Sequence, residues 1–215
     1  MQDAPVTLSR SMLRSMLRMQ DRMNTRVHPD WIAQGFAWHR AIWVECAELV
    51  DHYGYKWWKH QDHDLAQVQL EVVDIWHFGL SACFRQGESI EAIAGRIARD
   101  WPSPPASRGV LESAEALAAV AAGDGAFSVT DFAALLQAAA MSFDELFRQY
   151  LAKHVLNVFR QDHGYQQGAY RKLWAGREDN EHLKELLPAI DTAAENAEAE
   201  LYRALAQRYA ATARG

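Results

Sequence analysis

The chain has 215 residues, 49% of them hydrophobic, with eight Trp and eight Phe but only six Pro. This composition suits a folded globular protein with a sizeable core and argues against a disordered chain or a turn-rich β architecture. The formal charge of -6 argues against non-specific nucleic-acid binding, which requires clustered Lys and Arg to neutralise phosphates. No window reaches the roughly 18–20 uninterrupted apolar residues of a membrane span, and no apolar signal segment is visible. We therefore expect a cytoplasmic protein.

Apolar residues recur at helical spacing along most of the chain, and the alternation typical of strands is scarce. The sequence therefore predicts an all-α fold, a helical bundle with a four-helix-type core. The expected helices cover residues 7–26, 31–53, 64–85, 89–99, 109–122, 130–140, 142–160 and 181–214, the last interrupted near Pro188.

The clearest break in this pattern is the Trp-Pro-Ser-Pro-Pro run at residues 101–105. An alanine-rich stretch with little chemical content follows it. We predict a single all-α domain over residues 1–215, with a core at about 7–100 and 141–215 and a smaller segment at about 101–140 that could move relative to it.

The first expected helix carries Gln20 and Asn24, which lie four residues apart and so share one face. Such a pair either lies at the surface or binds the edge of a base by hydrogen bonds. The second role is possible because each amide supplies both donors and an acceptor. The residue pattern alone leaves both interpretations open.

Two apolar segments each carry a pair of carboxylates three residues apart, Glu45 with Glu48 and Glu71 with Asp74. On a helix this spacing places both acids of a pair on one face. An isolated pair usually forms a solvated stripe, but its repetition with apolar flanks favours buried acids, which repel one another unless a cation lies between them. Oxygen ligands without thiolate or imidazole at matching spacing favour Mg²⁺ or Mn²⁺ over zinc. The sequence therefore predicts a metal site of four acids.

Between these segments lies a tryptophan pair, Trp57 and Trp58, flanked by two lysines. It is either a hydrophobic plug or a planar wall for a ring, with cations nearby for phosphate. One turn after Asp74, His77 either orients that carboxylate or is a satisfied core histidine, and we favour the core histidine.

The expected helix at 142–160 presents a polar face, and the loop at 162–174 after it is rich in Gly, aromatic and basic residues. An isolated face of this kind is usually solvated, but a following loop of this composition suits close backbone approach to an anion. The polar face of the expected helix at 142–160 consists of Lys153, Asn157 and Arg160. Further along the chain, Asp179 or Asn180 could be a helix N-cap.

Together these motifs resemble the all-α dimeric dUTPases, within the all-α nucleoside triphosphate pyrophosphohydrolases that include MazG-like proteins. The resemblance covers most of the chain except its middle region. It rests on Met-Gln-x-x-x-Asn at 19–24, the two acidic pairs, Lys-Trp-Trp-Lys at 56–59, Lys153-x-x-x-Asn157-x-x-Arg160, the Gly-Tyr-x-x-Gly-x-Tyr-x-Lys-x-Trp run at 164–174, and Glu178-Asp179-Asn180.

The resemblance implies a homodimer that hydrolyses dUTP, and dUDP as a second substrate, to dUMP. It implies two or more Mg²⁺ ions, with Mn²⁺ as a substitute, held by Glu45, Glu48, Glu71 and Asp74. Glu48 is the expected carboxylate that orients or deprotonates the attacking water, with Glu45 as the second candidate. The expected phosphate-binding residues are Lys153, Asn157, Arg160, Tyr165 and Lys172, and the expected base- and sugar-binding residues are Gln20, Asn24, Trp58, Phe78 and Asn180.

Other readings remain open at this point. The same metal acids could serve a pyrophosphohydrolase for another nucleotide, such as dCTP. A carboxylate-bridged di-iron bundle typically has Glu-x-x-His on two of its helices, but no His lies three residues after Glu45 or Glu71. A non-catalytic nucleotide-binding or scaffold protein would have no need of intact metal acids together with the basic C-terminal residues.

Overall fold

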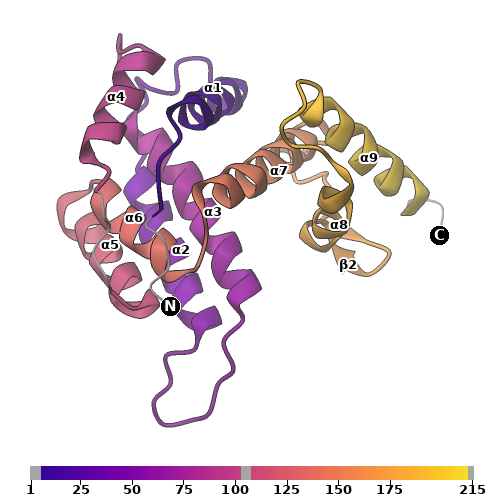
Figure 1. Ribbon diagram of the computed structural model, residues 1–215. Coiled ribbons are helices and arrows are strands. Elements are labelled where there is room, and N and C mark those ends of the chain that lie inside the picture. Colours follow the sequence, from indigo (N-terminus) through magenta and orange to yellow (C-terminus); the bar gives the residue numbers. More distant parts are fainter. Residues whose placement is uncertain (1–5, 103–107, 213–215) are drawn as a thin grey trace. The chain divides into compact units, whose positions relative to one another are not determined.

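The computed structural model describes residues 6–102 and 108–212 (Figure 1). Helices dominate this part of the chain, and its strands are the two short arms of one hairpin, so the all-α prediction is confirmed. The elements in order are α1 (Arg10–Val27), α2 (Trp38–Tyr53), α3 (Leu65–Cys83), α4 (Ile90–Asp100), α5 (Val110–Asp124), α6 (Val129–Ala138), α7 (Phe143–Asp162), β1 (Leu173–Trp174), β2 (Arg177–Glu178), α8 (Asp179–Leu186), a 3₁₀ turn (Leu187–Ala189) and α9 (Ala197–Thr212).

Several helices begin where the sequence supplies a capping side chain. In each case a Ser or Asp oxygen accepts a hydrogen bond from a backbone N–H of the first turn, which satisfies a donor that the helix itself cannot pair. These caps are Ser9 for α1, Asp64 for α3, Ser89 for α4 and Ser128 for α6.

The second helix starts at Trp38, later than the predicted start of the 31–53 segment. Residues 31–35 form turns, and Gly35 has a left-handed φ of 61°, which interrupts a regular helix. Trp31 is nevertheless buried and packs edge-on against Phe84 at 4.9 Å between ring centroids. Its apolar character therefore reflects packing of a loop and not a further helical turn.

The predicted interruption of the last helix near Pro188 is confirmed, because Pro188 lies in the 3₁₀ turn that follows α8. The gap is longer than expected, since α9 begins only at Ala197. Residues 213–214 of the predicted helix, and 103–105 of the predicted break, lie outside the described residues.

The chain divides into two compact units, Met1–Phe147 and Arg148–Gly215. In the first unit α2 packs along α3, α5 packs against α2, and α6 packs against α5 (Figure 1), while α1 packs against α3 and α4. At its centre the Trp76 ring stacks on Phe132 at 4.5 Å. The organisation as one domain with a movable segment at 101–140 stays a prediction.

The second unit has its own aromatic core, built around Phe159 of α7 and Trp174 of β1. Both side chains are buried, and their ring centroids lie 5.7 Å apart. Tyr209 of α9 packs edge-on against both, and His182 of α8 stacks on Trp174 at 5.2 Å. This core joins the hairpin to the three helices of the unit.

None of the helices in the described residues has the length and apolarity required to cross a membrane.

Candidate metal and nucleotide site

Three of the predicted metal ligands converge between α2 and α3. Glu45 comes from α2, and Glu71 and Asp74 come from α3, and each offers an oxygen within 4.8 Å of the others. Glu71 is buried, whereas Glu45 and Asp74 are partly buried. Within the described residues this group contains only carboxylates, a donor set that fits Mg²⁺ or Mn²⁺ better than zinc. We call these three residues the acidic triad.

The electrostatics of the acidic triad favour a cation. The pKa of Glu45 is raised to about 8, chiefly by burial, then by the negative charge of Asp74 and by contact with Glu71. Without a cation such a carboxyl group is largely protonated at neutral pH. A divalent ion between the acids would favour the ionised form instead, because ligand oxygens must be deprotonated to bind metal.

The fourth predicted ligand, Glu48, lies outside the acidic triad. It is exposed on α2, one turn after Glu45, although its charge contributes to the raised pKa of Glu45. The structure therefore brings together three of the four predicted acids, and Glu48 is exposed to solvent on the same helix as Glu45.

A histidine that the sequence analysis did not single out borders the acidic triad. His52 Nε2 lies 3.5 Å from Glu71 Oε1. Its position could have been predicted, because His52 follows Glu48 by four residues and Glu45 by seven, so the three share one side of α2.

The predicted amide pair forms part of a hydrogen-bonded chain between α1 and α3. Gln20 and Asn24 are 5% and 6% exposed, so the surface-amide interpretation is wrong. Gln20 Nε2 donates to Asn24 Oδ1 at 3.0 Å, and Asn24 Nδ2 donates to Ser81 Oγ at 2.9 Å. His77 Nδ1 lies 2.9 Å from Gln20 Oε1. We call these four residues the amide chain.

The direction of the amide chain follows from its last link. Ser81 Oγ donates its single proton to the carbonyl of His77 at 3.0 Å, so it accepts from the amide of Asn24. The Asn24 oxygen then accepts from Gln20, and the Gln20 oxygen accepts from Nδ1–H of His77. His77 is buried, as predicted for a core histidine. Each amide is thereby held with a defined donor end and acceptor end.

The aromatic residues predicted to wall the base and sugar differ in their surroundings. Phe78 is partly buried and stacks on Trp38 with ring centroids 6.3 Å apart, a partner that the sequence analysis missed. Trp57 and Trp58 are 90% and 59% exposed in the α2–α3 loop, which excludes a hydrophobic plug within the first unit. Their rings contact each other edge-on at 5.5 Å.

The second unit gathers predicted phosphate- and base-binding residues around one acid, Asp179, that the sequence suggested only as a helix cap. Arg160 Nε and Nη2 donate to its two oxygens, each at 2.8 Å, and Arg160 Nη1 donates to Asn157 Oδ1 at 3.2 Å. Although burial opposes the charged forms, this ion pair raises the pKa of Arg160 and lowers the pKa of Asp179. Lys153 is buried on the same helix.

The remaining predicted residues of this unit lie nearer the surface. Tyr165 is half-exposed, and its ring centroid lies 5.9 Å from the guanidinium carbon of Arg160. Lys172 Nζ lies 3.4 Å from Glu178 Oε2. Asn180 Oδ1 is buried and has no hydrogen-bond partner in the described part of the chain. An unpaired buried amide oxygen is costly, and a ligand N–H would relieve that cost.

A family model described as dUTPase matches residues 12–165. The chain belongs to this dUTPase family. The match includes the acidic triad, the amide chain and the polar face of α7, and membership implies a hydrolase that acts on dUTP. No curated protein matches the chain. In this dUTPase-family chain Lys172 and Asn180 lie beyond the matched residues, so their expected roles depend on the C-terminal motif alone.

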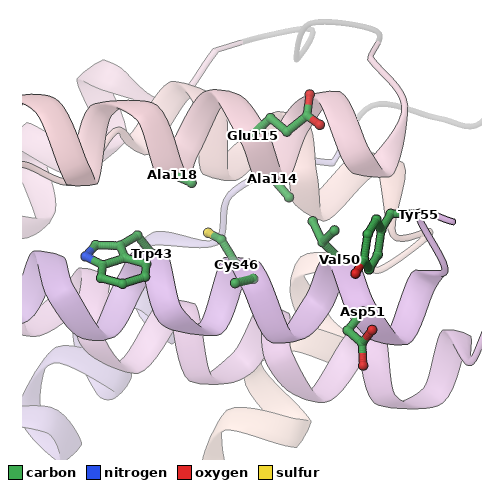
Figure 2. A pocket seen from close by; sticks show the side chains of 9 residues that line it. Trp43, Cys46, Val50, Asp51, Tyr55, Ala114, Glu115 and Ala118 are labelled. Atoms are coloured by element: carbon green, nitrogen blue, oxygen red, sulfur yellow. The ribbon is translucent and has the colours of Figure 1, made fainter.

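A shallow hollow of about 570 Å³ lies elsewhere, between α2 and α5 (Figure 2). Helical spacing places its lining residues on α2 on the side opposite Glu45. Most of the lining is apolar, and its charged residues, Asp51 and Glu115, are both acids, so the lining offers no cationic side chain to a triphosphate. It is lined by Trp43, Cys46, Ala47, Val50, Asp51, Tyr55, Ala114, Glu115 and Ala118.

Proposed function

We propose that this dUTPase-family chain hydrolyses dUTP, and also dUDP, to dUMP at a metal site on the acidic triad. The observation that carries the proposal is the convergence of Glu45, Glu71 and Asp74 within 4.8 Å, in a chain whose family acts on dUTP. Carboxylates placed this closely are costly in a partly buried site unless a cation offsets their charge.

Two or more Mg²⁺ ions, when bound, would neutralise phosphate oxygens and lower the pKa of a water molecule. The protein holds the ligand oxygens on two packed helices, so the site is largely formed before substrate binds. His52, beside Glu71, would hold that carboxylate in its orientation in the way that outer partners orient metal ligands.

Glu48 is the proposed residue that orients the attacking water and takes its proton. Its exposure on the same side of α2 as Glu45 supports this role, because a base needs access to water and substrate. Glu45 is the second candidate, because it lies one helical turn before Glu48 on the same side of α2.

Residues of the second unit are the proposed ligands of the phosphate chain, and amide side chains are the proposed ligands of the base. The acceptor end of Asn180 suits the ring N–H of uracil, because its buried Oδ1 lacks a partner within the described residues. Gln20 and Asn24, whose amide groups the hydrogen bonds of the amide chain hold in a fixed orientation, are the proposed ligands of the base and sugar in the first unit. The proposed phosphate ligands are Lys153, Asn157, Arg160, Tyr165 and Lys172.

Phe78 and Trp58 would wall the deoxyribose and base, with Trp38 supporting Phe78 from behind. A ribose 2′-OH against such an apolar wall would be buried without a partner, which disfavours UTP.

We also propose that the protein is a cytoplasmic homodimer. Exposed apolar side chains on α2 and its loop support a protein partner: Trp43 is 41% exposed and Trp57 is 90% exposed. Light scattering coupled to size exclusion would give the mass directly, and a monomeric mass at micromolar concentration would contradict the dimer.

The decisive experiment measures pyrophosphate release from dUTP with Mg²⁺ by the native chain and by Glu48→Gln. We expect activity in the native chain and a loss of at least about a hundredfold in the variant, since a general base contributes factors of this size. Glu115→Gln is the matched control, because Glu115 is exposed on α5 in the hollow opposite Glu45. An inactive native chain would overturn the proposed function, and an active Glu48→Gln variant would overturn only the role of Glu48.

Base selectivity is tested in the same assay with dCTP, dTTP and UTP alongside dUTP. We expect dUTP to have the highest kcat/KM. A preference for dCTP would instead support a pyrophosphohydrolase that uses the same metals with a different base pocket.

A further inference from the structure

Asp179, at the first residue of α8, is a fully buried carboxylate whose lone pairs are all engaged. Besides the two hydrogen bonds from Arg160, it accepts from the Tyr170 hydroxyl at 2.8 Å and from the backbone N–H of Asn180 at 2.8 Å. Its own backbone N–H donates to the carbonyl of Lys172 at 3.0 Å. A carboxylate has about four acceptor positions, so these four donors occupy it completely.

This arrangement changes what Arg160 can offer a ligand. The Arg160–Asp179 pair has no net charge, and three of the five guanidinium N–H groups are used by Asp179 and Asn157. Arg160 is therefore suited to donate oriented hydrogen bonds and is not a source of net positive charge. Its position is rigid, because two parallel hydrogen bonds fix the plane of the guanidinium.

Asp179 also connects residues with different proposed tasks. Its side chain holds Arg160 and its backbone holds Lys172, both proposed phosphate ligands, while its carboxylate holds the backbone of Asn180, the proposed base reader. We propose that Asp179 is a positioning residue that sets the distance between the phosphate-binding groups and Asn180 for a single nucleotide. This inference rests on the proposed function.

Helix capping does not account for Asp179. The cap of α8 is Glu178, which forms a reciprocal capping box with Glu181. The unit also has anchors that are independent of Asp179: His182 Nε2 donates to the carbonyl of Trp174 at 2.9 Å, and their rings stack. Loss of the Asp179 charge should therefore disturb the Arg160 side chain more than the fold of the unit.

The first test is Asp179→Asn, assayed for dUTP hydrolysis by the full chain with Mg²⁺. We expect KM to rise by about tenfold or more, because hydrogen bonds to a charged partner are lost, and kcat to fall by less than about threefold. A variant that was only less folded would show the opposite, a lower apparent kcat with unchanged KM. Preference for dUTP over dCTP should also fall, since the acceptor of the Asn180 backbone N–H loses its negative charge and the Arg160 hydrogen bonds that fix its orientation.

The matched control is Asp162→Asn in the same unit. Asp162 is exposed, and its Oδ2 accepts from the Tyr202 hydroxyl at 2.8 Å, so the substitution again replaces an aspartate bonded to a tyrosine. We expect its KM for dUTP to stay within about twofold of the native value. An unchanged KM in Asp179→Asn, or an equal rise in both variants, would overturn the positioning role.

A double-mutant cycle tests whether the pair acts as a unit. Arg160→Lys keeps the charge but cannot form the two-pronged contact. We expect Arg160→Lys to raise KM about as much as Asp179→Asn does. We expect the KM of the double variant to be no higher than that of either single variant. Fully additive effects on KM would show that the two residues act separately and would overturn the proposal.

Pyrophosphate binding separates failure of this inference from failure of the proposed function. If the native chain does not hydrolyse dUTP, the proposed function fails, and the inference is judged by calorimetric titration with inorganic pyrophosphate and Mg²⁺. Weaker binding by Asp179→Asn than by Asp162→Asn would support the positioning role in that case. Equal binding by the two variants, or no binding by the native chain, would overturn it.

Discussion

His77 Nδ1 lies 2.9 Å from Gln20 Oε1, and this hydrogen bond joins α3 to α1 one helical turn after Asp74. Asp74 belongs to the acidic triad and His77 to the amide chain, so α3 carries groups of both the proposed metal site and the proposed base site. A displacement of α3 would therefore move the groups that it contributes to each of these two sites. The two sites of the first unit are therefore expected to respond together when either is altered.

Ser81→Ala should weaken both stability and base selection, because it removes the hydroxyl that accepts from Asn24. Leaving that buried donor unpaired should lower the free energy of unfolding by about 1–3 kcal/mol, as measured by urea denaturation. Ser113→Ala is the control: Ser113 is also fully buried, but its Oγ has no hydrogen-bond partner in the described residues, so its loss should be neutral or stabilising. Equal destabilisation by the two substitutions would contradict the amide chain.

Gly79→Ala should destabilise the first unit because α3 has no room for a side chain there. A Cβ at Gly79 would lie 2.5 Å from the Phe127 ring, which packs against Trp76 and Phe132. We expect a loss of about 1–3 kcal/mol in the free energy of unfolding, typical of overpacking. Gly95→Ala on α4 meets nothing within 4 Å and should instead stabilise by up to about 1 kcal/mol. Thermal unfolding of both variants would detect opposite shifts in Tm.

Asp74→Asn should weaken Mg²⁺ binding by at least about tenfold, since it removes one charged ligand of the acidic triad. Isothermal titration without nucleotide would measure this directly. Asp51→Asn is the matched control, because Asp51 is exposed on α2 and lines the hollow on the opposite side of that helix. Similar Mg²⁺ affinities in the two variants would mean that the metal site does not include Asp74.

The sequence predicted the helices and acid pairs well, because both depend on local periodicity. It could not distinguish Glu45 from Glu48: residues three apart on a helix point in similar directions, and only the packing of α2 on α3 decides which one meets Glu71. Contacts between distant segments were missed because they too depend on how the helices pack and not on local periodicity. Trp38 and Phe78 stack although they lie far apart in the sequence.

The Arg160–Asp179 pair was missed for a related reason. It depends on the β1–β2 hairpin, which returns the chain to α7. The sequence supplied a sound clue, an arginine on a polar helix face followed by an acid at the start of the next helix. Neither residue alone indicates that the two side chains meet, because no periodicity relates them.

Metal-free protein should lose stability as pH rises from about 4.5 to about 8. The pKa of Glu45 is raised to about 8 in the folded state from an ordinary value of 4.5, so the folded chain binds more protons than the unfolded chain in this window. Stability that depends on the protonated carboxyl is therefore fully present below pH 4.5 and lost above pH 8.

Mg²⁺ should oppose the loss, because it binds the ionised triad and competes with the proton for Glu45. Tm measured in EDTA and in excess Mg²⁺ from pH 5 to about 9 would test this, with Glu45→Gln as the control that cannot titrate. A Tm in EDTA that rises with pH in the native chain but not in Glu45→Gln would contradict the raised pKa of Glu45.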